Sequence, residues 1–143
     1  RAEARQTAQP VAAGPDIRGA KVLLVEDNDL NMEIAQFLLE NEGAIVTRAW
    51  NGQQALEAFE ASEPGTFDVI LMDVMMPVMG GLEATRRIRA LPRPDAATVP
   101  IFAMTANAFQ DDIERSRAAG MNEHLTKPLE SQQLITMIAR YRR

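Results

Sequence analysis

The sequence contains no cysteine, and its 143 residues include one histidine, one tryptophan and one tyrosine. Without cysteine, the chain can form neither disulfides nor zinc-thiolate sites, and it has no thiol nucleophile. The absence of cysteine suits a reducing compartment. We therefore expect a cytoplasmic location, which also allows a parent protein anchored in the inner membrane.

Long apolar runs and an excess of basic charge are missing as well. The most apolar stretch is interrupted by Asp73 and Glu83, so it falls short of the roughly 20 residues that a membrane-spanning helix needs. The first 20 residues have no apolar core and do not resemble a signal peptide. The net charge of -5 argues against a general nucleic-acid binder. Contact with nucleic acid or membrane is therefore not expected of this fragment.

The chain is expected to be a linker followed by one domain. Residues 1–19 carry proline and glycine among small and polar residues and show no sustained period, which predicts a flexible linker. Residues 20–143 are enough for one domain with its own core. Because the chain begins at Arg1 rather than at a methionine, we expect it to come from a longer polypeptide.

Short apolar runs alternate with helical segments along this domain. The runs predict buried strands at residues 21–25, 44–48, 69–72, 99–104 and 121–125. Helices are predicted from residue 28 or 29 to Gly43, from Asn51 to Pro64, over residues 81–91 and 109–118, and up to the C-terminus. This alternation, with long crossovers between strands, predicts a doubly wound α/β domain with a parallel sheet.

Two helices carry further sequence signals. The first is expected to be a helix on which Leu30, Ile34, Phe37, Leu38 and Asn41 share one face. The second is expected to begin with a capping box, because Asn51 is followed three residues later by Gln54.

Polar side chains follow four of the predicted strands. Glu26 and Asp27 follow the first strand, Asp73 the third, Thr105 the fourth and Lys127 the fifth. Each alone is an ordinary turn or capping residue. Together they meet at the carboxyl edge of a parallel sheet, where ligands bind. Their joint occurrence favours a functional site.

The chemistry of this set indicates phosphoryl transfer. Three crowded carboxylates repel one another and should recruit a hard divalent cation, for which Mg²⁺ is the natural candidate. With that charge balanced, Asp73 can attack phosphorus and form an acyl phosphate. Lys127 is then expected to pair with one phosphoryl oxygen, and Thr105 to donate its hydroxyl to another.

At these residues the sequence resembles the receiver domains of two-component response regulators, most closely those of hybrid sensor histidine kinases. The resemblance spans residues 21–141 and rests on four segments, at residues 25–31, 72–82, 103–107 and 119–128. It implies the flavodoxin-like receiver fold, in which five helices flank a five-stranded parallel sheet of order 2-1-3-4-5. It also implies that the chain is part of a hybrid histidine kinase.

The resemblance assigns a role to each acidic residue. Asp73 is implied to accept a phosphoryl group from a phosphohistidine. Asp27 and Asp73 are implied to ligate Mg²⁺ directly, Glu26 through water, and Met75 through its backbone carbonyl. The implied partners are the phosphodonor domain of a histidine kinase, in cis or in trans, and a histidine phosphotransfer protein. The oligomeric state stays open.

The resemblance also implies a conformational switch. Lys127 is implied to bind the phosphoryl group and to precede a cis peptide bond at Pro128, and Thr105 is the implied switch hydroxyl. The family usually has an aromatic residue three positions before this lysine, where this chain has His124. We expect His124 to be a partly exposed strand residue at the switch position, rather than a phosphodonor or metal ligand. The expected output surface comprises its strand and the last two helices.

Met75 and Asn107 occupy positions that tune attack by water in this family. Because a thioether orients water poorly, we expect a long-lived acyl phosphate.

Two other interpretations remain open. A phosphohydrolase of the haloacid dehalogenase type also uses an aspartyl nucleophile, but it needs a second aspartate where this chain has Met75. The second interpretation is an interaction module that is never phosphorylated. It does not explain why Asp73, Thr105 and Lys127 occur together.

Overall fold

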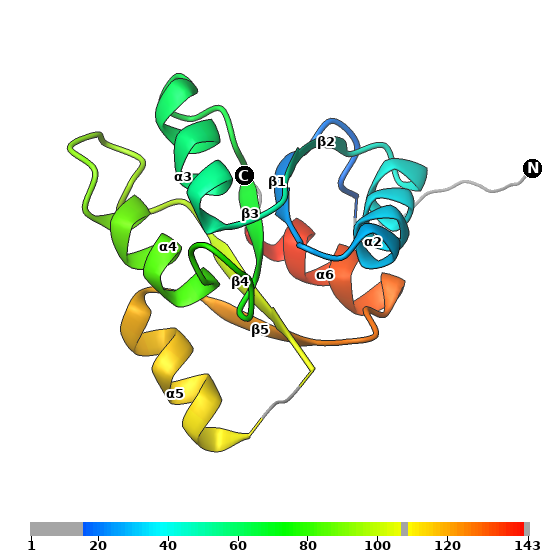
Figure 1. Ribbon diagram of the computed structural model, residues 1–143. Helices are drawn as coiled ribbons and strands as arrows, with labels where there is room; N and C mark the ends of the chain where they lie inside the picture. The colour runs from blue at the N-terminus through cyan, green and yellow to red at the C-terminus, as the bar shows by residue number, and fades with distance from the viewer. Residues whose placement is uncertain (1–15, 107–108, 142–143) are drawn as a thin grey trace, which may run out of the picture.

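The computed structural model describes residues 16–106 and 109–141, and the expected role of Asn107 lies outside these residues. Strands and helices alternate along the described chain, as predicted (Figure 1). The strands are β1 (Lys21–Val25), β2 (Ile45–Ala49), β3 (Val69–Asp73), β4 (Ile101–Thr105) and β5 (Glu123–Thr126). The helices are α2 (Asp29–Asn41), α3 (Gly52–Ala61), α4 (Gly81–Arg89), α5 (Gln110–Ala119) and α6 (Ser131–Tyr141).

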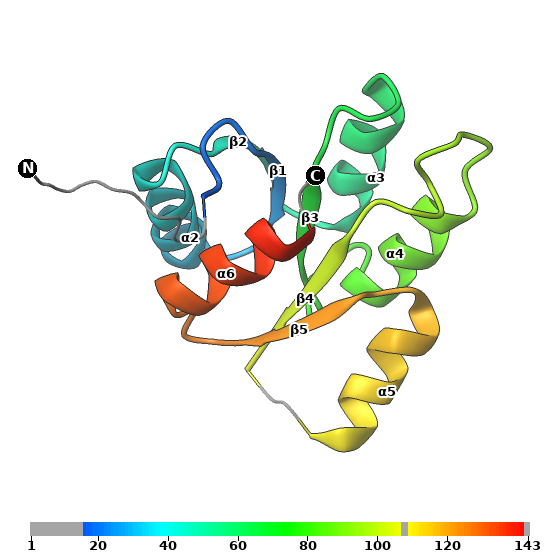
Figure 2. The ribbon, with the colours of Figure 1, turned by 180° about the vertical axis from the view of Figure 1, so that it is seen from behind.

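The strands form one parallel sheet in the order β2-β1-β3-β4-β5, which confirms the predicted order. Helices α2 and α6 cover one face of the sheet, and α3, α4 and α5 cover the other (Figure 1, Figure 2). The predicted strand ends differ from the observed ones by at most two residues. Because all five strands are parallel, their carboxyl ends lie at one edge of the sheet.

The central strands are buried on both faces, as expected of a parallel sheet between two helical layers. On β1, Leu24 packs in the apolar cluster that includes α2 and α6, whereas Leu23 packs in the cluster that includes α3 and α4. On β3, Leu71 and Ile70 divide in the same way. The alternation follows from the two-residue period of a strand. It holds the ends of β1 and β3 between two packed layers.

The face predicted for the first helix lies mostly in solvent. Leu30, Ile34 and Phe37 are 64%, 47% and 66% exposed, Asn41 is exposed and Leu38 is half-buried. The buried residues of α2 are instead Met32, Ala35 and Leu39. Both sets recur at helical spacing, so α2 carries two apolar stripes, and only one of them reaches the core.

Side-chain caps fix the beginnings of α2 and α3. Asn28 is the N-cap of α2, and its side-chain oxygen accepts the N–H of Asn31 at 2.9 Å. Asn51 accepts the N–H of Gln54 at 2.8 Å, while the Gln54 side chain accepts the N–H of Trp50 at 2.8 Å. The predicted capping box is confirmed, with Trp50 rather than Asn51 as its second backbone donor.

The chain packs onto the domain before the expected boundary. Ile17 is 1% exposed and belongs to the apolar cluster of α2 and α6, and Gly19 donates its N–H to the Gly43 carbonyl at 2.8 Å. Residues 1–15 of the expected linker lie outside the described part of the chain. The division at residues 19 and 20 stays a prediction. Among residues 16–106 and 109–141, we find no helix with the length and apolar character needed to cross a membrane.

A buried arginine anchors the long connection between α4 and β4. The guanidinium of Arg93 lies 4.4 Å from the ring centroid of Phe59 and 2.7 Å from the Asp95 carboxylate. It also donates to the Phe59 carbonyl at 2.6 Å. The Arg93 and Asp95 side chains are only 12% and 15% exposed, so the pair is screened less than a surface ion pair.

We predict that Arg93→Ala lowers the free energy of unfolding by about 2 kcal/mol, because it removes the contact with Phe59 and leaves the half-buried Asp95 carboxylate without its ionic partner. Urea denaturation measures this change. The matched control is Arg87→Ala, because the Arg87–Glu83 pair at 2.7 Å is about half exposed. We expect this control to change stability by less than about 0.5 kcal/mol. Equal effects of the two substitutions would contradict an anchoring role of Arg93.

Candidate functional site

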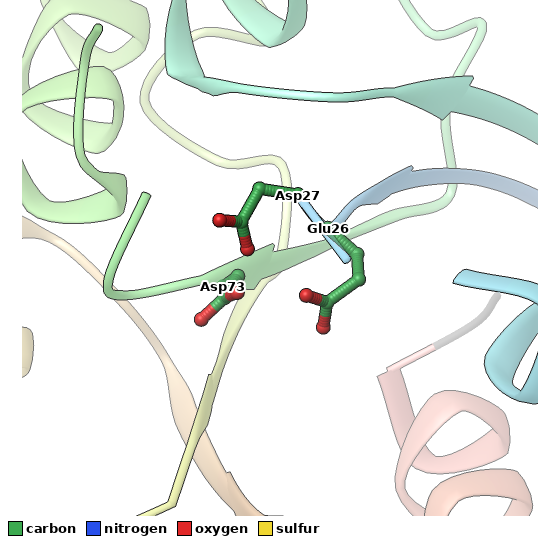
Figure 3. A group of neighbouring side chains, drawn as sticks. All are labelled: Glu26, Asp27 and Asp73. Carbon is green, nitrogen blue, oxygen red and sulfur yellow. The ribbon is translucent and has the colours of Figure 1, made fainter. Parts of the chain in front are cut away.

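Three carboxylates gather where β1 and β3 end. Glu26 and Asp27 directly follow β1, and Asp73 is the last residue of the neighbouring strand β3. Each offers an oxygen atom, and these three atoms lie within 4.8 Å of one another. Figure 3 shows the three side chains converging from the two strand ends. Glu26 and Asp73 are buried at 2% and 4% exposure, whereas Asp27 is exposed.

Lys127 reaches the same carboxylates from the end of β5. Its Nζ lies 2.8 Å from a Glu26 oxygen and 3.1 Å from an Asp73 oxygen. Its backbone N–H donates to the carbonyl of Thr105 at 2.8 Å, which ties it to the end of β4. The Lys127–Pro128 peptide bond is cis, as the resemblance implies. The structure thus brings together the predicted acidic residues and the predicted lysine.

Burial and like charge both disfavour the ionised form of Asp73. Desolvation, followed by the hydrogen bond and charge of Glu26, raises the pKa of Asp73 to about 7, and the ammonium of Lys127 limits the rise. Burial on its own lowers the pKa of Lys127, but the contacts with Glu26 and Asp73 outweigh it and raise the pKa. The ammonium form of Lys127 is therefore stabilised within the site, while Asp73 carries charge that is only partly balanced.

This donor set fits a hard divalent cation. Carboxylate oxygens are the ligands that Mg²⁺ prefers, and it usually takes only one or two of them alongside water and phosphate. Asp27 is exposed, so it can offer oxygen to an ion that keeps several waters. Glu26 directs one oxygen to Lys127 and the other to the N–H of Asn28 at 3.2 Å. Both oxygens of Glu26 therefore have partners, which agrees with a contact to the ion through water rather than a direct one.

Backbone contacts hold the carboxylate of Asp73 in place, and the sequence did not reveal all of them. One Asp73 oxygen accepts the N–H of Met75 at 3.3 Å. Gly81, at the start of α4, donates its N–H to the Val74 carbonyl at 3.0 Å, and a Cβ there would lie 2.2 Å from the Asp73 carbonyl oxygen. In the sequence, Gly81 directly follows Gly80. The adjacent glycines were the available signal for this close approach.

Thr105 and His124 lie beside the carboxylates rather than among them. Thr105 is the half-buried last residue of β4, and His124 is a half-buried residue of β5 that pairs with Ala103. Both line a cavity of about 310 Å³ that is also bordered by Met75. The prediction that His124 is a partly exposed strand residue is confirmed. Its switching role stays a prediction.

We predict that Asp73→Asn stabilises the metal-free protein more at about pH 8 than at about pH 5. The pKa of Asp73 is raised in the folded state. Its contribution to the free energy of unfolding is therefore fully present below the unfolded pKa of 3.8, and it is lost as the pH rises through about 7. Asparagine cannot ionise and escapes this loss. The advantage of the variant should grow by on the order of 1–3 kcal/mol, measured by urea denaturation in a chelator.

The control for this measurement is Glu83→Gln, which neutralises an exposed carboxylate paired with Arg87. Its effect should stay within about 0.5 kcal/mol at either pH. An advantage of Asp73→Asn that does not change with pH would show that ionisation of Asp73 does not oppose folding.

Comparison with known proteins identifies the family. The family model of the response regulator receiver domain matches residues 22–139. Over 128 residues the chain is 36% identical to hybrid signal transduction histidine kinase I of Dictyostelium discoideum, and the match covers 88% of this chain and 7% of that protein. The chain thus spans only a small part of the curated histidine kinases that it matches.

Two solved structures are similar to this chain in both fold and sequence. One is the receiver domain of sensor histidine kinase PA1611 from Pseudomonas aeruginosa, which has magnesium coordinated in its active site cleft. It is 41% identical, with a TM-score of 0.78, and the match covers 86% of this chain and 97% of that chain. The other is a co-crystal structure of the Saccharomyces cerevisiae histidine phosphotransfer signaling protein Ypd1 and the receiver domain of its downstream response regulator Ssk1. A chain of that structure is 32% identical, with a TM-score of 0.77, over 87% of this chain and 89% of that chain. The chain belongs to the response regulator receiver domains of two-component signalling, and its relatives include the receiver domains of hybrid histidine kinases.

Proposed function

We propose that this receiver domain takes a phosphoryl group from a phosphohistidine of a protein partner and holds it on Asp73. The observation that carries the proposal is the position of Lys127, whose Nζ lies 2.8 Å from Glu26 and 3.1 Å from Asp73 at the edge of the sheet. A single ammonium beside three gathered carboxylates leaves an acidic site that still needs positive charge. A divalent ion satisfies that need and allows the site to accept a negatively charged phosphoryl group.

In the proposed reaction, a carboxylate oxygen of Asp73 attacks the phosphorus of the phosphohistidine. A P–O bond forms, the P–N bond breaks, and the imidazole nitrogen of the donor takes up a proton. Lys127 turns its ammonium to a phosphoryl oxygen, and the Thr105 hydroxyl donates to another. Mg²⁺ held by Asp27, Asp73 and the Met75 carbonyl, with Glu26 acting through water, would balance the negative charge of carboxylates and phosphoryl oxygens.

The same geometry disfavours a phosphohydrolase. Such an enzyme needs an acid or base beside its aspartyl nucleophile to turn over water. Two residues beyond Asp73 the chain offers the thioether of Met75, which can neither give nor take a proton. The acyl phosphate is therefore proposed to persist until a partner or slow hydrolysis removes it. A module that is never phosphorylated leaves the gathering of Asp73, Thr105 and Lys127 at one edge of the sheet unexplained.

An apolar surface beside the site supports a protein donor. Leu30, Ile34 and Phe37 form the exposed stripe of α2. Ile34 also lines a groove of about 310 Å³ that includes Glu26 and Lys127. Apolar area of this kind next to a reactive centre is typical of a protein interaction surface. We propose that it docks a histidine phosphotransfer protein, because the Ssk1 receiver, in a similar structure, was crystallised with one.

The remaining features of the proposal concern the parent protein and the output. We propose a hybrid histidine kinase as the parent, in the cytoplasm or facing it, with its own kinase domain or a separate one as donor.

Phosphorylation would shift the population of two conformations. Thr105 and His124 line one cavity, so movement of the hydroxyl toward the phosphoryl group would change the space beside His124. The surface of α5, β5 and α6 is the proposed output surface.

We predict that acetyl phosphate labels the purified chain stably at Asp73, and only with Mg²⁺ present. Intact mass with peptide mapping measures the label, and beryllium fluoride should bind under the same conditions. Asp73→Asn should abolish labelling because it removes the nucleophile, whereas Glu83→Gln, which changes an exposed carboxylate elsewhere, should not. Release of inorganic phosphate without a lasting label would support a phosphohydrolase. If no label forms at all, the interpretation that remains is an interaction module that is never phosphorylated.

We predict that Phe37→Glu slows phosphoryl transfer from a histidine phosphotransfer protein about tenfold, which corresponds to about 1.4 kcal/mol of lost docking energy. Labelling by acetyl phosphate should not change, since Phe37 is 66% exposed and lies outside the acidic site. The matched control is Phe109→Glu. Phe109 is 68% exposed and precedes α5, on the opposite side of the sheet from α2 (Figure 1). Equal losses in both variants would argue against docking at α2.

A further inference from the structure

We propose that Met75 is an oxidation site through which peroxides shorten the lifetime of phosphorylated Asp73. This inference rests on the proposed function, since it concerns the acyl phosphate of that site. It adds a regulatory input, carried by a small oxidant, that acts on the receiver domain itself.

The methionines of the chain differ sharply in access to solvent. Of the eight methionines, all of which lie in the described residues, Met75 alone is exposed, at 78%. Five others are buried and two are half-buried, namely Met32, Met72, Met79, Met104 and Met121, followed by Met76 and Met137. Because oxidation of a thioether depends on access, a mild oxidant should modify Met75 first.

The exposed thioether stands next to the reactive carboxylate. The backbone N–H of Met75 donates to a carboxylate oxygen of Asp73 at 3.3 Å, so a change at residue 75 acts within one hydrogen bond of the phosphoacceptor. The Met75 side chain also borders the cavity that Thr105 lines. This cavity, of about 310 Å³, has room for water. Residue 75 therefore has a side chain open to solvent and adjoins both Asp73 and the cavity lined by Thr105.

Oxidation changes what this side chain can do. Hydrogen peroxide transfers one oxygen atom to the sulfur and leaves as water, so the thioether becomes a sulfoxide and the peroxide is reduced. A thioether is a weak hydrogen-bond acceptor, whereas a sulfoxide is polar and accepts well. A sulfoxide at residue 75 can hold a water molecule beside the acyl phosphate. Hydrolysis returns Asp73 to its carboxylate and releases inorganic phosphate.

The test compares acyl phosphate lifetimes before and after mild treatment with hydrogen peroxide. The chain is first treated, then labelled with acetyl phosphate and Mg²⁺, and the decay of the label at Asp73 is followed by intact mass. Peptide mapping locates the sulfoxide. We expect oxidation at Met75 ahead of the other methionines and a lifetime about fivefold shorter, the rate change that one neutral hydrogen bond supplies.

Two variants separate oxidation of Met75 from general damage, each compared with its own untreated sample. Met75→Leu removes the sulfur and should lose the response to peroxide. Met76→Leu removes the neighbouring, half-buried thioether and should keep it. A third variant, Met75→Gln, places a carbonyl acceptor at a similar reach and should shorten the lifetime without any oxidant.

The outcomes also separate this inference from the proposed function. If no label forms on Asp73 in the untreated chain, the proposed function fails. If the label forms but peroxide spares Met75, or oxidised Met75 leaves the lifetime unchanged, only the inference is overturned. A peroxide response that persists in Met75→Leu would also overturn it, because the effect would then arise at another residue.

Discussion

The contact of Lys127 with Glu26 and Asp73 is the interaction on which the site depends. Two of the three carboxylates are buried, and each buried charge without a partner destabilises the folded state. The ammonium reaches both at 2.8 and 3.1 Å, so one cation stabilises two anions. It does not neutralise the cluster, and the pKa of Asp73 is still raised to about 7. The folded protein therefore tolerates an acidic site whose charge is only partly balanced.

The fold supplies what this contact needs, which is rigid placement of groups that are far apart in sequence. Asp73 and Lys127 end two strands of one parallel sheet, separated by β4. Strand β3 is buried along its whole length, so its last residue has little freedom. Beyond it, Gly81 approaches the Asp73 carbonyl so closely that a Cβ would lie 2.2 Å from its oxygen. Packing of α4 against the strand end thus limits how far the reactive carboxylate can move.

The sequence predicted the strands, and the meeting of Glu26, Asp73 and Lys127 at their ends, for a common reason. Strands buried on both faces are short apolar runs, and polar residues that interrupt such runs, as Asp73 does, fall at their ends. What the sequence could not provide is distance. Whether Lys127 contacts Glu26 as well as Asp73 depends on the path of the turn after β5. The close approach of Gly81 likewise depends on how α4 meets β3. Neither leaves a periodic signal.

The sequence did not show that the predicted face of α2 is exposed, because hydrophobic periodicity reports that a stripe is apolar and does not report what covers it. The true core stripe contains Ala35, a small side chain that adds little to the signal, whereas Leu30, Ile34 and Phe37 are large. A helix that keeps three large apolar residues in water gains nothing for its own stability from them. They lie on the helix that follows Glu26 and Asp27, and Ile34 shares a groove with Lys127. Such a local conflict between pattern and burial is expected at functional surfaces, and here it falls beside Glu26 and Lys127.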